Sequence, residues 1–148
     1  MRVELREVRE GDLEALYAFQ AEPEIVASGF VPHREHDAFL THMRWAMGVP
    51  GSIMRAIVVN GALAGSIVKF ERGGVFEVGY LIGKPFWGQG IASRALEALL
   101  KLTDDRPLYG VCVAENVASQ RVLQKCGFRL DHKVVEVDGT LLFHFVLV

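Results

Sequence analysis

Hydrophobic and polar residues alternate along several short segments of the chain, a period of two that is typical of β-strands. Asn60-Gly61 and Asp138-Gly139 each stand between two such segments, where these residue pairs predict tight hairpin turns. Strands are therefore expected at residues 2–8, 53–59, 64–70, 75–82, 108–113, 128–137 and 140–148.

Apolar residues at a spacing of three and four predict helices after Gly11-Asp12 and at about residues 35–47, 91–102 and 116–126. Residues 22–33 hold Pro23, Gly29 and Pro32, which predict a broken helix or a loop. The expected order is β-α-α-β-β-β-α-β-α-β-β. This order predicts an α/β fold with a mixed sheet of six or seven strands and helices on both faces.

Composition narrows the class of protein. The chain has 148 residues, of which 51% are hydrophobic, and a net charge of −2. These values predict one globular domain over residues 1–148, with no basic surface for nucleic acid. The charged start and the absence of a long apolar run predict no signal peptide and no membrane span. Cys112 and Cys126 lack the spacing of metal or redox sites, so we expect a cytoplasmic protein without a metal.

A glycine-rich turn from Gly83 to Gly90 joins a predicted strand to a predicted helix. Backbone N–H groups and the helix dipole at such a turn favour a phosphate group, although a plain connecting turn has the same composition. A P-loop requires a lysine and a hydroxyl where Gln89-Gly90 stands. A dinucleotide site requires a glycine or alanine at the third place of its motif, where this chain has Ser93. It also requires an acidic residue at the end of the next strand, whereas Asp104-Asp105 precede that strand.

The stretch Trp87-Gly88-Gln89-Gly90-Ile91-Ala92 resembles the acyl-CoA-binding motif of the GNAT superfamily of N-acetyltransferases, Gln/Arg-x-x-Gly-x-Gly/Ala. Tryptophan at the first place is similar to the branch that includes the ribosomal-protein N-terminal acetyltransferases. Three further segments resemble this branch in order, at residues 5–13, 77–82 and 116–128. The resemblance implies a GNAT-type fold with a mostly antiparallel sheet, acetyl-CoA as cosubstrate and an amine acceptor.

The resemblance also implies the cofactor contacts. Backbone amides from Gly88 to Ser93 are expected to hold the pyrophosphate. Asn116 begins the second cofactor helix, where its residue type also predicts an N-cap. The fourth strand is expected to splay from its neighbour, so that pantetheine pairs with its free edge and an N–H near Ile82 polarises the thioester carbonyl. The expected cofactor residues are Leu81, Ile82, Gly83, Trp87, Gly88, Gln89, Gly90, Ile91, Ala92, Ser93 and Asn116.

Two residues are candidates for catalysis. Glu77 is the candidate base that deprotonates the amine. Because it lies roughly 13 Å along the strand from Leu81, it acts either through a water or by meeting the amine deeper in the cleft. A solvated or ion-paired carboxylate is the alternative. Ser119 lies on the apolar stripe of its helix. Its hydroxyl either bonds to the Glu115 carbonyl or, as proposed for relatives with serine here, protonates the leaving thiolate.

The expected reaction is direct attack of a primary amine on acetyl-CoA in a ternary complex. The acceptor is a protein N-terminal amine or a small-molecule amine, and the loop from Ser28 to His33 lies where the family builds its acceptor site. A non-catalytic acyl-CoA-binding or regulatory module on the same fold is the alternative. A homodimer is common in the family. Cys126 is expected to be a small core residue.

Overall fold

One seven-stranded sheet organises the chain in the computed structural model, which describes residues 1–148. Every strand and helix expected from the sequence is present, and their ends differ from the expectation by at most two residues for most elements. The elements are β1 (Val3–Glu7), η1 (Glu10–Asp12), α1 (Leu13–Gln20), α2 (Pro23–Ser28), α3 (His36–Met47), β2 (Ile53–Val59), β3 (Ala62–Arg72), β4 (Val75–Ile82), η2 (Lys84–Phe86), α4 (Ile91–Leu100), β5 (Leu108–Val113), α5 (Val117–Lys125), β6 (Arg129–Val135) and β7 (Leu141–Leu147).

The strands lie in the order β1-β2-β3-β4-β5-β7-β6. All neighbours are antiparallel except β4 and β5, which are parallel. This confirms the predicted mixed, mostly antiparallel sheet. The hairpin between β2 and β3 forms at the predicted pair, where both Asn60 (φ 48°) and Gly61 (φ 85°) adopt the left-handed conformation that such turns require.

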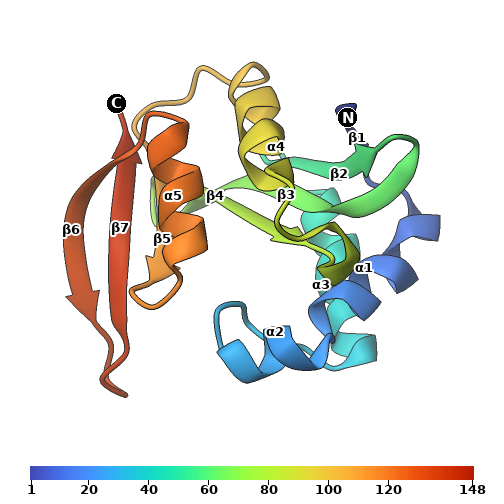
Figure 1. Ribbon diagram of the computed structural model, residues 1–148, viewed down its shortest axis with the longest axis horizontal. Coiled ribbons are helices and arrows are strands. Elements are labelled where there is room, and N and C mark those ends of the chain that lie inside the picture. Colours follow the sequence, from blue (N-terminus) through green and yellow to red (C-terminus); the bar gives the residue numbers. More distant parts are fainter.

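Helices cover both faces of the sheet, as predicted (Figure 1). Helices α4 and α5 lie on the near face in this view, and α1 and α3 lie behind the sheet. Each face of the sheet has its own hydrophobic core, and consecutive residues of β2 point into different ones. Ile57 packs in the core with α4 and α5, whereas Ala56 packs in the core with α1 and α3. None of the helices has the length and apolar character that a membrane span requires.

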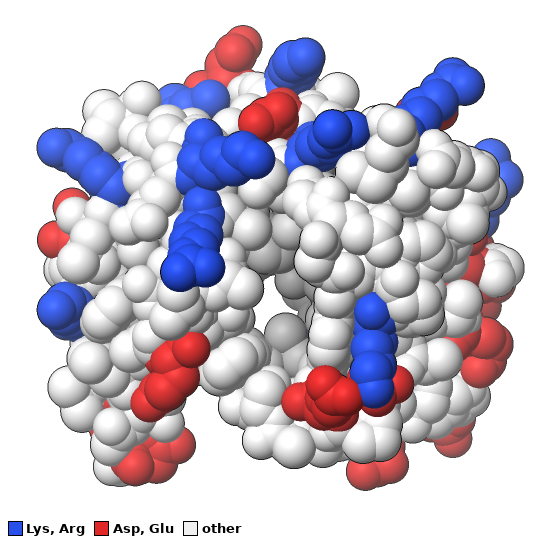
Figure 2. Space-filling model, viewed as in Figure 1, with Lys and Arg blue, Asp and Glu red and all other residues white.

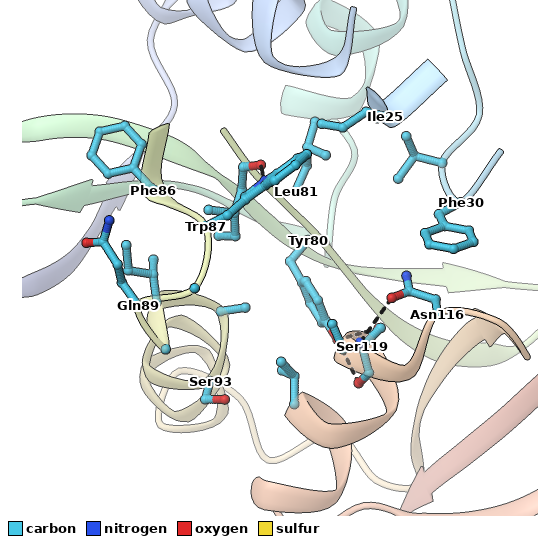
Figure 3. Close-up of a pocket in the computed structure, with 18 of the residues that line it drawn as sticks. Ile25, Phe30, Tyr80, Leu81, Phe86, Trp87, Gln89, Ser93, Asn116 and Ser119 are labelled. Carbon is cyan, nitrogen blue, oxygen red and sulfur yellow. Dashed lines mark hydrogen bonds between the residues drawn. The ribbon is translucent and has the colours of Figure 1, made fainter. Parts of the chain in front are cut away.

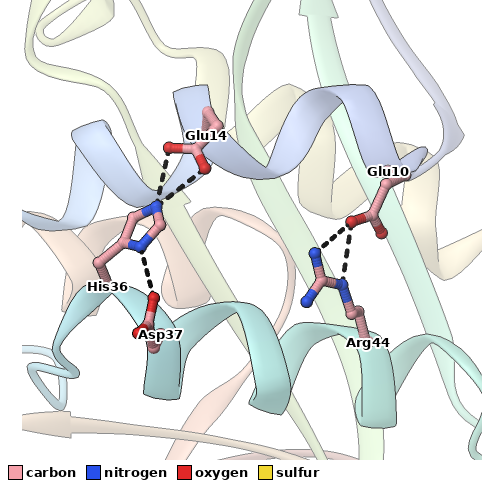
Figure 4. A network of polar contacts seen from close by, with 5 residues as sticks. All are labelled: Glu10, Glu14, His36, Asp37 and Arg44. Atoms are coloured by element: carbon pink, nitrogen blue, oxygen red, sulfur yellow. Dashed lines mark hydrogen bonds and ion pairs between the residues drawn. The ribbon is translucent and has the colours of Figure 1, made fainter.

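Ion pairs join α1 and α3 behind the sheet (Figure 4). His36 Nε2 lies 2.8 Å from Glu14 Oε1, and Arg44 Nη2 lies 2.5 Å from Glu10 Oε1. Asp37 and Glu14 raise the pKa of His36 through these hydrogen bonds. Two carboxylates, Glu14 and Asp37, thus surround His36 at one end of this helix pair, and Glu10 of η1 pairs with Arg44 at the other end. His36 therefore belongs to the packing of α1 against α3.

The sheet opens into a wedge along one edge of β4. Strand β4 pairs with β3 along its whole length, from Val75 to Ile82. It pairs with β5 only over Phe76–Val78, and the two strands have no further paired residues beyond that point. The splayed strand expected from the sequence is therefore present, and the second half of β4 has one edge without a neighbouring strand. We call this opening the wedge.

Candidate active site

The glycine-rich turn brings several backbone N–H groups to the start of α4. Gly88 and Gly90 have φ values of +73° and +74°, a left-handed conformation that a side chain would strain. The first helical hydrogen bond of α4 runs from the Arg94 N–H to the Gly90 carbonyl, at 3.3 Å. The N–H groups of Ile91 and Ser93 therefore lie in the unpaired first turn, where anions bind favourably.

A cavity of about 600 Å³ adjoins this turn. It gathers residues from five parts of the chain: α2 and the loop after it, the end of β4, the turn, α4 and α5 (Figure 3). Ten of the eleven expected cofactor residues line it, namely Leu81, Ile82, Trp87, Gly88, Gln89, Gly90, Ile91, Ala92, Ser93 and Asn116. Gly83 does not, because it faces the Phe19 ring of α1, where an added Cβ would lie 2.6 Å from the ring.

The unpaired edge of β4 presents the backbone of Ile82 to the wedge. The Gly83 N–H donates to the Ala64 carbonyl of β3 at 2.7 Å. Since the backbone groups of successive strand residues point to opposite edges, the N–H and carbonyl of Ile82 point away from β3, toward the edge that β5 has left. The Ile82 N–H is a donor available there to an extended amide-containing molecule.

Trp87 covers part of this edge. Its indole Nε1 donates to the Ile82 carbonyl at 2.8 Å, and the side chain is 40% exposed. The indole therefore pairs an acceptor that lies at the edge of the cavity. This contact was not expected from the sequence, where Trp87 is a departure from the usual Gln or Arg of the motif.

Ser119 lines the cavity from α5, with its backbone held by the helix cap. The Asn116 side chain accepts a hydrogen bond from the Ser119 N–H at 3.1 Å, which confirms Asn116 as the N-cap of α5. The Ser119 hydroxyl lies 2.7 Å from the hydroxyl of Tyr80 (Figure 3). The expected alternative bond to the Glu115 carbonyl is not formed, because the phenol across the wedge is its partner.

Tyr80 is the residue that sequence reasoning missed. The alternation of β4 places it on the same face as Phe76 and Val78, which predicts a plain core residue. Its ring does line the apolar wall, but its hydroxyl reaches Ser119 inside the cavity. Burial raises the pKa of Tyr80 to about 12, so the phenol is protonated at neutral pH. The hydroxyl of an inward-facing tyrosine usually has a hydrogen-bond partner, and this was the signal in the sequence that could have identified Tyr80.

Glu77 lies outside the cavity. Its carboxylate pairs with Arg72 at 3.1 Å, and its side chain is mostly buried, at 14% exposed. It stands in the segment of β4 that is paired with β5, opposite Tyr109. The ion-paired alternative expected from the sequence is therefore present, and the role of Glu77 as a base stays a prediction.

A second cavity of about 690 Å³ adjoins the first, and Ser28 and Phe30 line both. Its other wall carries Glu115 and Asp138, from the loop before α5 and the turn between β6 and β7. The sequence alone does not bring these carboxylates to the loop after α2, because they are separated from it by more than eighty residues. No group of three or more His, Cys, Asp or Glu side chains is arranged to hold a metal ion.

Charge is unevenly distributed over the face that holds the hollow (Figure 2). Lys and Arg side chains gather over the half that carries α5 and toward the upper edge, and Asp and Glu side chains lie on both sides of the lower edge. Helix α5 exposes Arg121 and Lys125, and α4 exposes Arg94. The half of this face that carries α5 is therefore positive, which suits an anionic ligand.

Solved structures with the same fold include several acetyltransferases. A GNAT-family acetyltransferase from Bacillus anthracis has a TM-score of 0.85 at 19% identity, over 100% of this chain and 95% of that one. The Salmonella typhimurium acetyltransferase that modifies the N-terminal serine of ribosomal protein L7/L12 has a TM-score of 0.84 at 20% identity, over 99% and 94%. The aminoglycoside acetyltransferase AAC(6')-Ib, solved with coenzyme A and kanamycin, has a TM-score of 0.81 at 19% identity, over 99% and 95%.

No curated protein matches the chain significantly in sequence. The family description "Acetyltransferase (GNAT) domain" matches residues 2–129, most of the chain. The neighbours include enzymes of the branch expected from the sequence. The fold, the glycine-rich turn and this match agree, and the chain belongs to the GNAT family of acetyl-CoA-dependent N-acetyltransferases.

Proposed function

We propose that this protein transfers an acetyl group from acetyl-CoA directly to a primary amine, with both substrates bound at once. The observation that carries the proposal is the position of Ile82. Its N–H and carbonyl face the wedge, beside the glycine turn on one side and Ser119 on the other, within one cavity. The cavity thus offers a phosphate site, a strand edge for an amide chain and a hydroxyl donor. These follow one another in the same order as the pyrophosphate, the pantetheine and the sulfur of acetyl-CoA.

Each group has a distinct task in this reaction. The amides at the start of α4 bind the pyrophosphate, and the basic side chains of α5 attract the anionic substrate. The Ile82 N–H stabilises the charge that develops on the thioester oxygen as the amine attacks. Ser119 donates a hydrogen bond to the sulfur as the carbon–sulfur bond breaks, and the proton lost by the amine passes to solvent or to a base.

The acceptor is a primary amine that is cationic when free. Glu115 and Asp138 in the second cavity support this proposal, because carboxylates at its wall favour a positive charge before the amine loses its proton. Phe30 supplies an apolar surface between the two cavities. Both acceptor types named for the structural neighbours, a protein N-terminus and an aminoglycoside, carry such an amine.

A panel of amines tests the function. Thiol release from acetyl-CoA is followed with ribosomal-protein N-terminal peptides, aminoglycosides, polyamines and amino acids, and the acetylated product is identified by mass. We expect acceptor-dependent thiol release with one class. Tight binding of acetyl-CoA without turnover on any acceptor would support the alternative, a non-catalytic acyl-CoA-binding module on the same fold.

A further inference from the structure

The hydrogen bond between Tyr80 and Ser119 crosses the wedge from β4 to α5. The Tyr80 hydroxyl lies 2.7 Å from the Ser119 Oγ and 3.3 Å from the Ser119 carbonyl oxygen. Figure 3 shows the phenol pointing at the start of α5, within the cavity. The shorter distance is that of a strong hydroxyl–hydroxyl bond, so Oγ is the principal partner.

Both side chains are held firmly. Asn116 caps α5 through the Ser119 N–H, which fixes the Ser119 backbone. The ring of Tyr80 packs against the core beneath α4 and α5. A hydroxyl pair between two fixed supports has a defined geometry, in contrast to a surface serine whose hydroxyl turns freely.

The direction of this bond follows from acidity. A phenol is a stronger acid than an aliphatic hydroxyl, so it is the better donor of the two. Tyr80 keeps its proton at neutral pH, because burial raises its pKa to about 12. With Tyr80 donating to Oγ, the Ser119 proton is not used by the phenol and can point into the cavity, although the Cys112 thiol also lies within reach of this hydroxyl.

We propose that Tyr80 is a positioning residue for the leaving group, and that its hydroxyl donates to Ser119 Oγ and so directs the Ser119 proton toward the sulfur of coenzyme A. This inference rests on the proposed function. Polarisation through a chain of two hydroxyls also strengthens the outer hydrogen bond.

The atoms balance without a proton leaving either hydroxyl. The amine nitrogen bonds to the thioester carbon, the carbon–sulfur bond breaks, and its electron pair goes to the sulfur. The thiolate accepts the Ser119 hydrogen bond, and the proton lost by the amine neutralises it afterward. Full transfer from Tyr80 to the sulfur is unfavourable, because a thiol with an ordinary pKa near 8.5 is a much stronger acid than this phenol.

The acidity of bound coenzyme A tests the proposal directly. The ultraviolet absorbance of the thiolate is titrated in the complex, with desulfo-coenzyme A as the reference ligand. Cys112 of β5 and Cys126 of α5 are the titratable groups beside Tyr80, and burial raises the pKa of both thiols, so the reference removes their contribution. We expect the bound thiol of the wild-type protein to be roughly tenfold more acidic than free coenzyme A.

Three variants complete the titration. Tyr80→Phe and Ser119→Ala should each return the bound thiol to the acidity of free coenzyme A, and the double variant should add nothing further. Tyr109→Phe is the matched control, since the Tyr109 ring meets His132 edge to face and lies outside the cavity. If Tyr80→Phe folds poorly, 3-fluorotyrosine at position 80 should make the bound thiol more acidic, because it is the stronger donor.

Kinetics supply a second readout. Tyr80→Phe should lower kcat by about tenfold, the size of a hydrogen bond to a charged group, and leave KM for acetyl-CoA within about twofold. An unchanged thiol acidity in Tyr80→Phe, or equal acidity of free and bound coenzyme A in the wild-type protein, would overturn the proposal. Failure of the amine panel alone would leave the titration intact, so the two failures are distinguishable.

Discussion

The role of a single carboxylate in this protein depends on the group that lies beside it. Glu77 illustrates this at its ion pair with Arg72, and Asp12 at its double contact with Arg6, where the two carboxylate oxygens lie 2.8 and 2.9 Å from the guanidinium nitrogens. Asp12 also accepts a hydrogen bond from the Arg9 N–H at 2.8 Å. A carboxylate thus stabilises the fold at Asp12, whereas the carboxylate of Glu77 is a candidate for catalysis.

Replacing Glu77 by glutamine tests its role as a base. A base that works through a water should give a variant with lower kcat and a shifted acid limb of the pH profile. Arg72→Ala is the matched control, because it breaks the same ion pair and leaves the carboxylate in place. Identical pH profiles of the wild-type enzyme and Glu77→Gln would remove Glu77 from the mechanism.

The pH dependence of stability follows from Asp12. The Arg6 guanidinium holds the pKa of Asp12 below its ordinary value in the folded protein. Its contribution to stability is therefore complete above about pH 4, the unfolded value, and is lost as the pH falls through the lower folded value. Asp12→Asn should cost about 1–3 kcal/mol at pH 7 in urea unfolding, and this difference should shrink in acid.

An exposed carboxylate serves as the control for Asp12. Asp104→Asn alters the same group on the surface, ahead of β5, and should leave the free energy of unfolding within about 0.5 kcal/mol of the wild type. A constant difference between wild type and Asp12→Asn from pH 7 to pH 3 would contradict the assignment of Asp12 as an ionised partner of Arg6.

At the scale of elements, the turn before α4 differs from other glycine turns in what lies beside it. Gly90 and Gly61 have similar left-handed backbones, and an added Cβ meets no protein atom within 4 Å at either place. Only Gly90 faces the cavity. Ala at each place should cost roughly 1–2 kcal/mol of stability. Gly90→Ala should also weaken coenzyme A binding by roughly tenfold, whereas Gly61→Ala should leave the calorimetric Kd unchanged.

The free edge of β4 gives a second prediction at this scale. Without ligand, the Ile82 amide should exchange its hydrogen quickly, and at a coenzyme A concentration of 100 times Kd the exchange should slow by about 100-fold. The neighbouring Gly83 amide is the internal control, because it already donates to Ala64. Equal protection of both amides in the free protein, measured by NMR, would contradict an unpaired edge.

Elements were predicted well because their signals are local. The hairpin at Asn60-Gly61 and the cap at Asn116 depend on residues next to each other, and both are confirmed. The bond from Tyr80 to Ser119 joins residues 39 positions apart, and period-two alternation alone assigns Tyr80 to the core. The position of Glu115 and Asp138 beside Phe30 likewise depends on how β5, α5 and the last hairpin pack.

For the whole molecule, the arrangement of charge matters more than the net charge of −2. Basic side chains gather over the half of the face that carries α5 (Figure 2), and Arg121 and Lys125 of this helix are exposed. Affinity for coenzyme A should therefore fall as salt rises. Arg121→Gln combined with Lys125→Gln should weaken binding severalfold at low salt and flatten the salt dependence. Lys133→Gln on β6, over the Phe143 ring, is the control for each of the two single variants, because it also removes one positive charge.

The wedge has a consequence for how the two halves of the sheet move. Strands β4 and β5 are paired only over Phe76–Val78, and the bond from Tyr80 to Ser119 spans the open side of the wedge, so any separation of the two halves there would stretch this bond. A hydrogen bond of 2.7 Å weakens within a few tenths of an ångström of separation. The strength of the hydrogen bond between Tyr80 and Ser119 therefore depends on how far the wedge is open. An acyl-CoA whose acyl group forces β4 and β5 further apart loses the alignment of Ser119. Such an acyl donor is therefore disfavoured without a direct steric clash.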